Sequence, residues 1–391
     1  MISVGILSIN IHSYYLNYGA ALHSFAFSKY LERCGVDSRI IDYRSKHFGD
    51  FRLDNPVVSY WKQRAPLKTI LNALLNTPSY RRKYKAFHRF YSSNCKMSDN
   101  GGIPFTYEDF VKSNCNLEFP ITVCESDVIW SPKTSKGFDR VFFCDCPCFE
   151  EKIKVAYAPS ISNTLLSAAQ EEEFRSLLQN FDYLSCREKQ TAEYVQSLTG
   201  RECVHVLDPV LLLEGSDYEP FMRKQRCGRY LLAYNVMKND SKMIRFAKAL
   251  AKKKGLRFIE LSDFVRNKLD HRTLTGRSLG EFLWLIKNAD YVVTNGFHGM
   301  CFCILFSKEF LVFERDGLDL KVKSLLEVLG LSERFVAADA SSSFLHRDDL
   351  IDWGNVNLLL NEQRRRSMKY INDSIVKNAI HYCSDGGGKP S

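Results

Sequence analysis

Apolar and polar positions along this chain follow two periods, one typical of buried strands and one typical of amphipathic helices. Residues 2–9 (ISVGILSI) form a nearly continuous apolar run. Residues 17–35 place apolar side chains at helical spacing, and residues 37–43 (DSRIIDY) are interpreted as a second strand. Strand, helix and strand in this order predict a parallel sheet. Asn17 is a typical helix N-cap and Gly35 a typical helix stop, so both ends of this helix are predicted as well.

The alternation is interrupted at about 55–115, where the sequence is helical and basic, and we interpret this part as an insertion. Beyond it, Ser241 and Gly255 are the expected cap and stop of one helix. Buried strands are predicted within 119–130, 152–162, 181–198, 203–213, 229–236, 256–264, 290–307 and 309–315. Helices are predicted in the second parts of 181–198 and 290–307, and at 241–255, 278–289, 322–331 and 355–383.

This order of elements predicts two doubly wound, Rossmann-like α/β domains that face a cleft. We expect the first domain at 1–178, with the helical insertion inside it, the second at 179–342, and a C-terminal helix with a disordered tail at 343–391. A chain of 391 residues is long enough for two domains of ordinary size. Open parallel sheets bind ligands beyond the carboxyl ends of their strands, so the loops after the strands are where site residues are expected.

The composition is that of a globular protein, with 45% apolar and 25% charged residues. No apolar run approaches the roughly 18–20 residues that span a bilayer, and the N-terminal residues lack the basic start of a signal peptide. We therefore expect a cytoplasmic protein whose 13 cysteines are reduced and mostly buried. The cluster CDCPC at 144–148 lacks the paired spacing of a zinc site, and its alternation is typical of a strand edge.

The net charge of +9 is concentrated in residues 62–96, where basic and aromatic side chains interleave at helical spacing. Three interpretations remain open for this segment. It forms a solvated helix face, or it meets anionic lipid headgroups or a lipid-phosphate substrate, or it binds nucleic acid. No nucleic-acid fold signature supports the third, so a nucleic-acid partner is not expected.

Two ionisable residues follow predicted strands at points where a helix begins. Arg187 lies in LSCREKQT, and His298 lies in NGFHG between Gly296 and Gly299. The N-terminus of a helix carries partial positive charge, so an arginine is unfavourable there unless an anion is also present. A bound carboxylate or phosphate would be such an anion. A histidine flanked by small residues can exchange protons close to a ligand. A surface arginine and a core histidine are the alternatives, and these residues alone leave them open.

Two aspartates also follow strands. Asp127 lies in ESDVIW, and Asp208 precedes Pro209. Each either orients a partner or caps a turn. The sequence contains no G-x-S-x-G, Walker loop, G-x-G-x-x-G or His-Glu metal motif, which disfavours serine hydrolase, P-loop and nicotinamide chemistry.

Taken together, these motifs resemble the polysaccharide pyruvyl transferase family from the first strand to about residue 336. Five blocks follow one another in the order of the family: VGILSIN…NYGAALHSFAF, ESDVIW, SCREKQTAEYV, LDPVLLL and YVVTNGFHGMCFCILF. The resemblance implies a fold similar to GT-B glycosyltransferases and a reaction in which phosphoenolpyruvate leaves a pyruvate ketal on a sugar. Phosphoenolpyruvate would be a co-substrate, and neither a metal nor a cofactor is expected.

By this resemblance the C-terminal domain would hold the donor and the N-terminal domain the acceptor glycan. Arg187 would match the donor-binding arginine of the family, and His298 its catalytic histidine. The expected donor-side residues are Arg187, Ser185, Lys189, Asn295, Gly299 and Arg315. The residues expected on the acceptor side or in structural roles are Asn17, Tyr18, Ser126, Asp127 and Asp208.

Two positions depart from the family pattern. Glu125 stands where the family usually has glycine, so the loop before Asp127 is expected to differ. Gly296 stands where some members carry an arginine, so a second cation for the donor must come from elsewhere. The candidates for that cation are Lys189, Arg315 and Arg334.

The expected acceptor is a lipid-linked oligosaccharide of a capsule or exopolysaccharide pathway, ketalised at positions 4 and 6 of a hexose such as galactose. Such an acceptor would bring the protein to the inner face of the membrane as a peripheral protein. Two other functions remain open: a GT-B glycosyltransferase that uses a nucleotide sugar, with Glu314 on the ribose, and a non-catalytic scaffold in polysaccharide assembly.

Overall fold

The computed structural model divides the chain into two compact units, which are described separately. The first unit comprises Met1–Gly49, Phe90–Leu213 and Leu360–Ser391, and the second comprises Asp50–Arg89 and Glu214–Leu359. The structure describes residues 3–9, 12, 16–45, 47, 52–99, 101–112, 115, 117–135, 137–162, 165–236, 241–262, 273–315, 319–337, 344–345 and 349–384.

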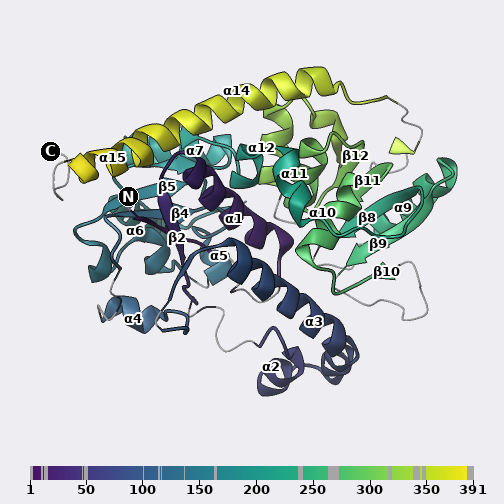
Figure 1. Cartoon of the computed structure of the whole chain (residues 1–391), viewed down its shortest axis with the longest axis horizontal. Coiled ribbons are helices and arrows are strands. Elements are labelled where there is room, and N and C mark those ends of the chain that lie inside the picture. The colour runs from purple at the N-terminus through teal and green to yellow at the C-terminus, as the bar shows by residue number, and fades with distance from the viewer. Residues whose placement is uncertain are drawn as a thin grey trace. The chain divides into compact units, whose positions relative to one another are not determined.

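A five-stranded parallel sheet forms the centre of the first unit, with the strand order β3-β2-β1-β4-β5. Three of its strands, β2, β4 and β5, are labelled in Figure 1. Its strands are β1 (Ser3–Leu7), β2 (Asp37–Ile41), β3 (Met97–Ser98), β4 (Ile121–Glu125) and β5 (Ile153–Tyr157). A short parallel pair, β6 (Ser185–Cys186) and β7 (Val204–His205), adjoins β5, because the Ala156 N–H donates to the carbonyl of Tyr183 at 3.0 Å. All these strands run in one direction, so their carboxyl ends meet at one edge.

The central strands β1 and β4 are almost completely buried, as expected for a parallel sheet that is covered on both faces. Asn17 caps the first helix as predicted, since its side chain accepts a hydrogen bond from the Gly19 N–H at 2.9 Å. The helices of the first unit are α1 (Tyr18–Arg33), α4 (Tyr107–Val111), α5 (Pro132–Ser135), α6 (Ala168–Leu178), α7 (Lys189–Thr199) and α15 (Lys377–Ser384). Short 3-10 turns, η1 (Arg140–Phe143), η2 (Pro147–Phe149) and η3 (Pro209–Leu212), and a π-helical turn, η6 (Asn372–Val376), complete it.

The second unit is built on a six-stranded parallel sheet with the order β10-β9-β8-β11-β12-β13. Its strands are β8 (Tyr230–Asn235), β9 (Arg257–Ser262), β10 (Thr273–Leu274), β11 (Tyr291–Thr294), β12 (Phe310–Phe313) and β13 (Phe335–Val336). The strand order reverses between β8 and β11. Loops leave a parallel sheet in opposite directions at such a reversal, which opens a crevice for a ligand at the carboxyl edge.

Helix α9 packs through Met243 and Leu250 on one face of the second sheet. On the other face Phe282 of α10 meets Tyr234 with ring centroids 5.1 Å apart, and Phe302 of α11 meets Phe282 at 5.7 Å. The helices that lie wholly in this unit are α2 (Pro56–Lys62), α8 (Gly215–Tyr218), α9 (Ser241–Lys253), α10 (Leu279–Lys287), α11 (Phe297–Leu305) and α12 (Leu320–Val328), with the 3-10 turns η4 (Glu219–Phe221) and η5 (Ser332–Arg334). Two long helices, α3 (Leu67–Asn94) and α14 (Trp353–Ile371), run from one unit into the other.

The compact units differ from the expected domains. Residues 179–213 belong to the first unit, although the boundary was expected at 178/179, because β6 and β7 adjoin β5. Residues 50–89, which include the first part of the insertion predicted at about 55–115, belong to the second unit. The C-terminal helix contributes to both units. The predicted long helix at 355–383 is confirmed within the described residues, whereas the expected disordered tail at 385–391 lies outside them.

Two expectations about cysteines are wrong. Cys115 and Cys148 form a disulfide bond, so not every thiol is reduced. The CDCPC cluster is not a strand edge but a pair of 3-10 turns, in which Cys144 ends η1 and Cys146 precedes η2. Within the described part of the chain, no helix is both long enough and apolar enough to cross a membrane.

Candidate active site

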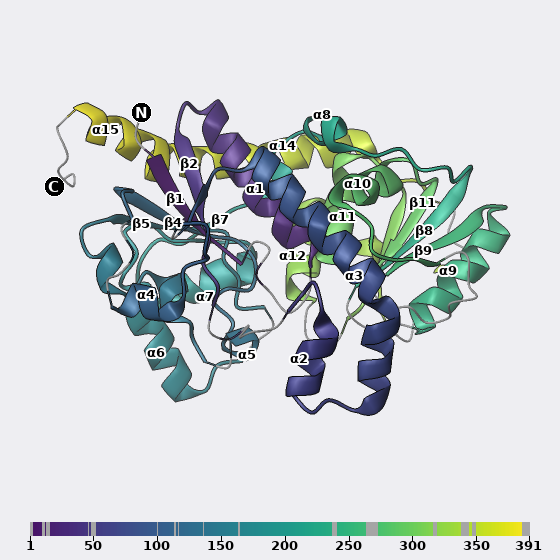
Figure 2. The same ribbon diagram turned by 60° about the horizontal axis from the view of Figure 1, so that its bottom comes forward.

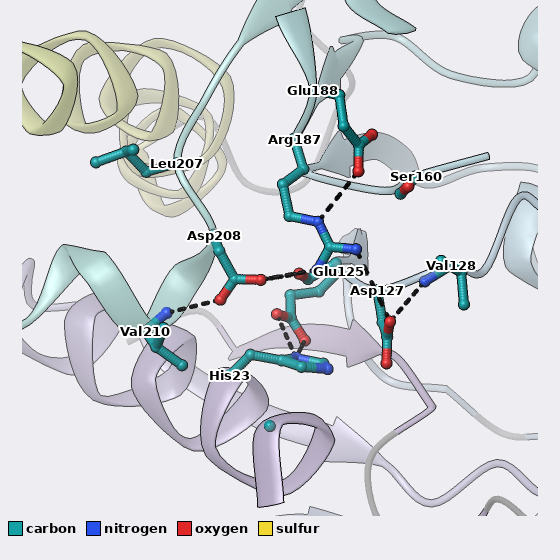
Figure 3. Close-up of polar contacts among 12 residues, drawn as sticks. His23, Glu125, Asp127, Val128, Ser160, Arg187, Glu188, Leu207, Asp208 and Val210 are labelled. Carbon is teal, nitrogen blue, oxygen red and sulfur yellow. Dashed lines mark hydrogen bonds and ion pairs between the residues drawn. The ribbon is translucent and has the colours of Figure 1, made fainter. Parts of the chain in front are cut away.

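The carboxyl edge of the first sheet gathers the charged residues that the sequence places after separate strands. Asp127 follows β4, Arg187 follows β6 and Asp208 follows β7. His23 of α1 and Glu125 at the end of β4 adjoin them (Figure 3). Parallel strands place these residues on one edge although up to 185 positions separate them in the sequence. We call the set of His23, Glu125, Asp127, Arg187, Glu188 and Asp208 the carboxylate cluster.

Arg187 is the centre of the carboxylate cluster, and its side chain is only 2% exposed. Its Nη1 donates to Oδ2 of Asp208 at 2.9 Å, its Nε approaches Oε1 of Glu188 at 3.4 Å, and its Nη2 lies 3.8 Å from Oδ1 of Asp127. Burial opposes the charge, but Glu188, Asp208 and Asp127 more than offset it and raise the pKa of the guanidinium. The cation at the start of α7 is therefore stabilised by carboxylates of the protein itself.

The carboxylate cluster carries an excess of negative charge. Its four carboxylates are matched by one guanidinium and one imidazole, so a negative excess remains even when the imidazole is protonated. A phosphate with a carboxylate next to it would meet repulsion here unless it displaced one of these groups. The charge balance thus disfavours the expectation that Arg187 binds the donor.

His23 and Glu125 form a fully buried pair, and this pair accounts for the first departure from the family pattern. The His23 Nδ1 lies 2.8 Å from Oε1 of Glu125, and the Ser24 hydroxyl donates to Oε2 of Glu125 at 3.0 Å. Burial lowers the pKa of His23, but Glu125 acts in the opposite direction and the net result is a raised pKa. The carboxylate that replaces the usual glycine is therefore neutralised by α1.

This pair predicts a pH dependence of stability. Because the pKa of His23 is raised in the folded protein, its contribution is complete below the unfolded pKa of about 6.5 and is lost as pH rises through the folded value. We expect the unfolding free energy of the wild type, measured relative to His23→Gln, to grow as pH falls from about 8 to about 6. Urea denaturation of both proteins at several pH values measures this, and a difference that is constant or shrinks on acidification would rule out the ion pair.

The loop that follows β4 has a constrained backbone. Ser126 and Asp127 both have left-handed backbone conformations, with φ of 52° and 58°, which residues other than glycine rarely adopt. Hydrogen bonds hold them: Ser126 N–H donates to the Tyr157 carbonyl at 2.8 Å, and Ser160 N–H donates to the Asp127 carbonyl at 2.9 Å. Asp127 is also the most exposed carboxylate of the cluster, with 10% of its side chain accessible, which makes it the member best placed to meet a ligand.

The other predicted site residues that lie in the first unit have mainly structural contacts, including Ser185 and Lys189, which were expected on the donor side. Tyr18 is buried at the start of α1. The buried hydroxyl of Ser185 donates to the Ala156 carbonyl at 2.7 Å and thereby joins β5 to β6. Lys189 is 53% exposed on α7 and lies 4.0 Å from Glu193. Asp208 both caps a turn and orients a partner. Its Oδ1 caps η3 by accepting from the Val210 N–H at 3.1 Å, and its Oδ2 pairs with Arg187.

In the second unit, His298 lies in the first turn of α11, beside the reversal point of the sheet. Asn295 precedes it and links the two strands at that point, because its Oδ1 accepts from the Val236 N–H at 2.7 Å and its Nδ2 donates to Asn235 at 3.2 Å. Asn295 thereby shapes the loops on both sides of the reversal. His298 is 93% buried, with 7% of its surface exposed, so the ring would meet a ligand in largely water-free surroundings.

The glycines that flank His298 are required by packing within the protein. A Cβ at Gly296 would meet Cγ2 of Val236 at 2.5 Å, and one at Gly299 would meet Oγ1 of Thr294 and Cδ1 of Tyr234 at 2.7 Å each. These distances leave no room for a side chain. The two glycines are therefore explained by the close packing of α11 on β8 and β11 and do not by themselves indicate a ligand.

A cation that the sequence interpretation missed lies beside Phe297, the residue that precedes His298. Lys321, in the first turn of α12, is 91% buried, and its Nζ lies 5.6 Å from the ring centroid of Phe297. The Phe297 ring in turn lies 5.2 Å from that of His298. Lys321 follows β12 just as His298 follows β11, and this equivalence of position is the signal that could have identified it.

The two other proposed cations of this unit differ in their surroundings. Arg315 follows β12, and its backbone N–H donates to Oδ1 of Asp319 at 2.9 Å. Arg334 is 2% exposed and forms ion pairs with Glu309, Glu333 and Asp349, so it ties η5 to the surrounding chain.

The structure thus gathers two sets of predicted residues. Asp127, Ser126, Asp208 and Arg187 meet in the first unit, and Asn295, His298 and Gly299 meet in the second. Arg187 and His298 belong to different units. Within the described residues, no three His, Cys, Asp or Glu side chains are arranged to hold a metal ion.

Solved structures of similar fold include UDP-N-acetylglucosamine 2-epimerases and a glycosyltransferase. A UDP-N-acetylglucosamine 2-epimerase from Rickettsia bellii aligns over 96% of this chain and 99% of its own, with 9% identity and a TM-score of 0.50. A glycosyltransferase from Rickettsia africae aligns over 98% and 99%, with 10% identity and a TM-score of 0.47. A UDP-GlcNAc 2-epimerase from Neisseria meningitidis aligns over 97% and 100%, with 8% identity and a TM-score of 0.48. At these identities the likeness concerns the fold alone, and the predicted Rossmann-like, GT-B-like architecture is confirmed.

Comparison with curated proteins gave no match. The family model described as polysaccharide pyruvyl transferase, however, matches residues 17–317. The matched range begins at the cap of α1 and includes the carboxylate cluster and the turn that holds His298. It covers more than half of the chain. The chain therefore belongs to the polysaccharide pyruvyl transferase family.

Proposed function

We propose that this protein transfers the pyruvate of phosphoenolpyruvate onto two hydroxyls of one sugar and releases phosphate. The observation that carries the proposal is the position of His298, at the start of α11 and beside the reversal point of the second sheet, with Lys321 close to the same turn. The reaction needs a site that binds an anionic substrate and a group that gives a proton to it. The helix N-terminus can bind the anion, and the imidazole can give the proton.

The donor in this proposal lies at the carboxyl edge of the second sheet. Its carboxylate and phosphate would face the N-terminus of α11, with Lys321 as the cation that binds them. Arg315 also follows β12, at the same edge of the sheet. This arrangement replaces the arginine that some family members carry at the position of Gly296. It also leaves Arg187 with a positioning role, because carboxylates of the first unit surround that side chain.

The reaction proceeds in two additions at C2 of the donor. Protonated His298 gives a proton to C3, and the C2 carbon becomes electrophilic. A sugar hydroxyl adds to C2 and loses its proton to the imidazole, which restores the acid. The C2–O bond to phosphate then breaks, and the phosphate departs with assistance from Lys321 and the N–H groups of α11. The second hydroxyl adds to C2 and closes the ketal, and its proton leaves with the phosphate.

The acceptor in this proposal is a lipid-linked oligosaccharide, with the ketal at positions 4 and 6 of a hexose such as galactose. The loop of Ser126 and Asp127 is the part of the first unit that would bind its hydroxyls, because Asp127 is the most exposed carboxylate there. Alignment of both hydroxyls with C2 is the main contribution that such a loop would make to the rate.

A nucleotide-sugar transferase is the second candidate, since Glu314 directly follows β12 at the same sheet edge. Thermal unfolding in the presence of each ligand separates the two. We expect phosphoenolpyruvate to raise the unfolding midpoint and UDP-sugars to leave it unchanged, because only a ligand that binds the folded state stabilises it. The reverse pattern would favour the nucleotide-sugar reaction.

Lys321→Met tests the donor site. Loss of a charge-assisted hydrogen bond to the donor is expected to raise KM for phosphoenolpyruvate roughly 10-fold to 100-fold, with a smaller change in kcat. Steady-state phosphate release measures both constants. Lys323→Met is the matched control, because Lys323 lies on the same helix but over the ring of Phe335, at 4.7 Å from its centroid. Equal effects of the two substitutions would remove Lys321 from the site.

A further inference from the structure

One face of the α2–α3 segment exposes large apolar side chains. Leu67, Leu71, Leu74 and Leu75 are 67%, 50%, 57% and 52% exposed, and Trp61 of α2 is 68% exposed. The four leucines lie at positions i, i+4, i+7 and i+8, which share one face of a helix. Among the described residues, this stretch of fifteen holds five of the eleven exposed large apolar side chains, so they form a patch rather than scattered positions.

The remainder of α3 exposes basic side chains instead of apolar ones. Pro78 divides the helix, and the part that follows contains Arg81, Arg82, Lys85 and Arg89, all exposed. Residues 55–94 contain eight lysines and arginines and no aspartate or glutamate. This segment therefore accounts for nearly all of the net charge of +9.

The basic part of α3 borders a cavity of about 630 Å³ in the second unit. Its lining adds Arg223 and Lys224 to the four cations of α3, while Glu281 is the one carboxylate of the lining. Glu281 is already paired, since its Oε1 accepts from Arg82 at 2.7 Å and from Arg277 at 3.0 Å. The cavity thus presents a strongly positive surface to any anion that reaches it.

The spacing of the two parts of α3 matches the layers of a membrane surface. Six residues separate Leu75 from Arg81, a rise of about 9 Å along a helix. The headgroup layer on one side of a bilayer is similar in depth, at roughly 5–8 Å. Leucines at the hydrocarbon boundary would thus place the cations beyond Pro78 at the level of the lipid phosphates. Figure 2 shows α2 and the first part of α3 as a helical pair that extends away from the strands of the second unit.

We propose that the α2–α3 segment docks the protein on an anionic membrane surface. The apolar face before Pro78 enters the interface, with Trp61 as an aromatic anchor, and the basic cavity after it holds lipid phosphates. This inference deepens the proposed function, because it rests on a lipid-linked acceptor and names the surface that would meet it. Nucleic acid fits less well, since phosphates alone would leave the leucine face uncovered.

Vesicle flotation of the full chain tests the proposal. The vesicles contain phosphatidylcholine with about one third phosphatidylglycerol, or phosphatidylcholine alone, at about 0.1 M and about 0.5 M salt. We compare the wild type with Leu71→Gln/Leu74→Gln/Leu75→Gln and with Arg81→Gln/Lys85→Gln. The control is Leu165→Gln/Leu358→Gln, which removes leucines that are 91% and 71% exposed elsewhere. Thermal unfolding of each variant verifies that it folds.

We expect the wild type to float with the anionic vesicles at low salt. The leucine variant should bind at least tenfold more weakly, and the basic variant about tenfold to thirtyfold more weakly, at roughly fivefold per cation. The control should bind as the wild type does. Failure of the wild type to float, or equal binding by a folded leucine variant, would overturn the proposal. So would a concentration-dependent dimer that the leucine substitutions dissociate, because the patch would then be an interface between two copies.

Flotation is measured without donor or acceptor sugar. A protein that floats as expected but transfers no pyruvate would contradict the proposed function and leave the docking surface intact. A protein that transfers pyruvate to a glycan but ignores vesicles would contradict the docking surface alone.

Discussion

Replacing His298 with alanine is expected to lower kcat by about 10²-fold to 10⁴-fold, while the Kd for phosphoenolpyruvate changes by less than about threefold. The imidazole is the group that would protonate C3 of the donor, and it lies at the reversal point of the second sheet. Donor affinity, in contrast, would come from Lys321 and the N–H groups of α11. Removal of the proton donor should therefore slow the chemical step and spare binding.

Phosphate release with a lipid-linked glycan extract measures kcat, and titration calorimetry measures Kd. His381→Ala is the matched control, since His381 is exposed on α15 of the first unit. Near-normal turnover of the His298 variant would show that another group supplies the proton. A large loss of donor affinity with unchanged turnover would assign His298 to binding alone.

Replacing Arg187 with leucine is expected to destabilise the folded protein by about 3–5 kcal/mol at neutral pH. Arg187 is the cation among Glu188, Asp208 and Asp127, and all of them are buried. Without it, these carboxylates remain in a medium of low dielectric and lose the guanidinium that lies next to them. The deficit should shrink as pH falls from about 7 to about 5, because carboxylates left without a partner take up protons more readily.

Urea denaturation of the wild type and the variant at both pH values measures this effect. Arg175→Leu serves as the control, because its ion pair with Glu172 is exposed and should contribute less than about 1 kcal/mol. A stable Arg187 variant with a raised KM for phosphoenolpyruvate would contradict the positioning role. It would instead support the donor-binding role that the family resemblance implies.

The strands and their direction could be predicted from the sequence. Residues 230–234 and 291–293 are apolar throughout because helices cover both faces of the sheet, and this continuity marks a buried parallel strand. Asn17 and Gly35 correctly predicted the two ends of α1, because the end of a helix depends on local hydrogen bonds and on backbone conformation. The edge strands β3, β10 and β13 have only two residues each, which is too short to produce a pattern.

The contacts between distant residues could not be predicted in the same way. Glu125 could be recognised as unusual, but its neutralisation by His23 depends on how α1 lies against β4. The position of Arg187 at a helix start suggested an anion, and the structure shows that the anions are the side chains of the protein itself. The unit boundary after Leu213, the Cys115–Cys148 disulfide and the burial of Lys321 near Phe297 likewise depend on tertiary packing.

The central claim is that phosphoenolpyruvate is the donor of a ketal. In the most direct test, the protein is incubated with carbon-13-labelled phosphoenolpyruvate and with lipid-linked glycans extracted from cells that make this protein. The glycans are then analysed by mass spectrometry. We expect a glycan whose mass has increased by that of labelled pyruvic acid less one water, with one phosphate released per product. His298→Ala should form this product at least about 100-fold more slowly. A glycan that instead gains a sugar from a nucleotide sugar and takes no label from phosphoenolpyruvate would contradict the account.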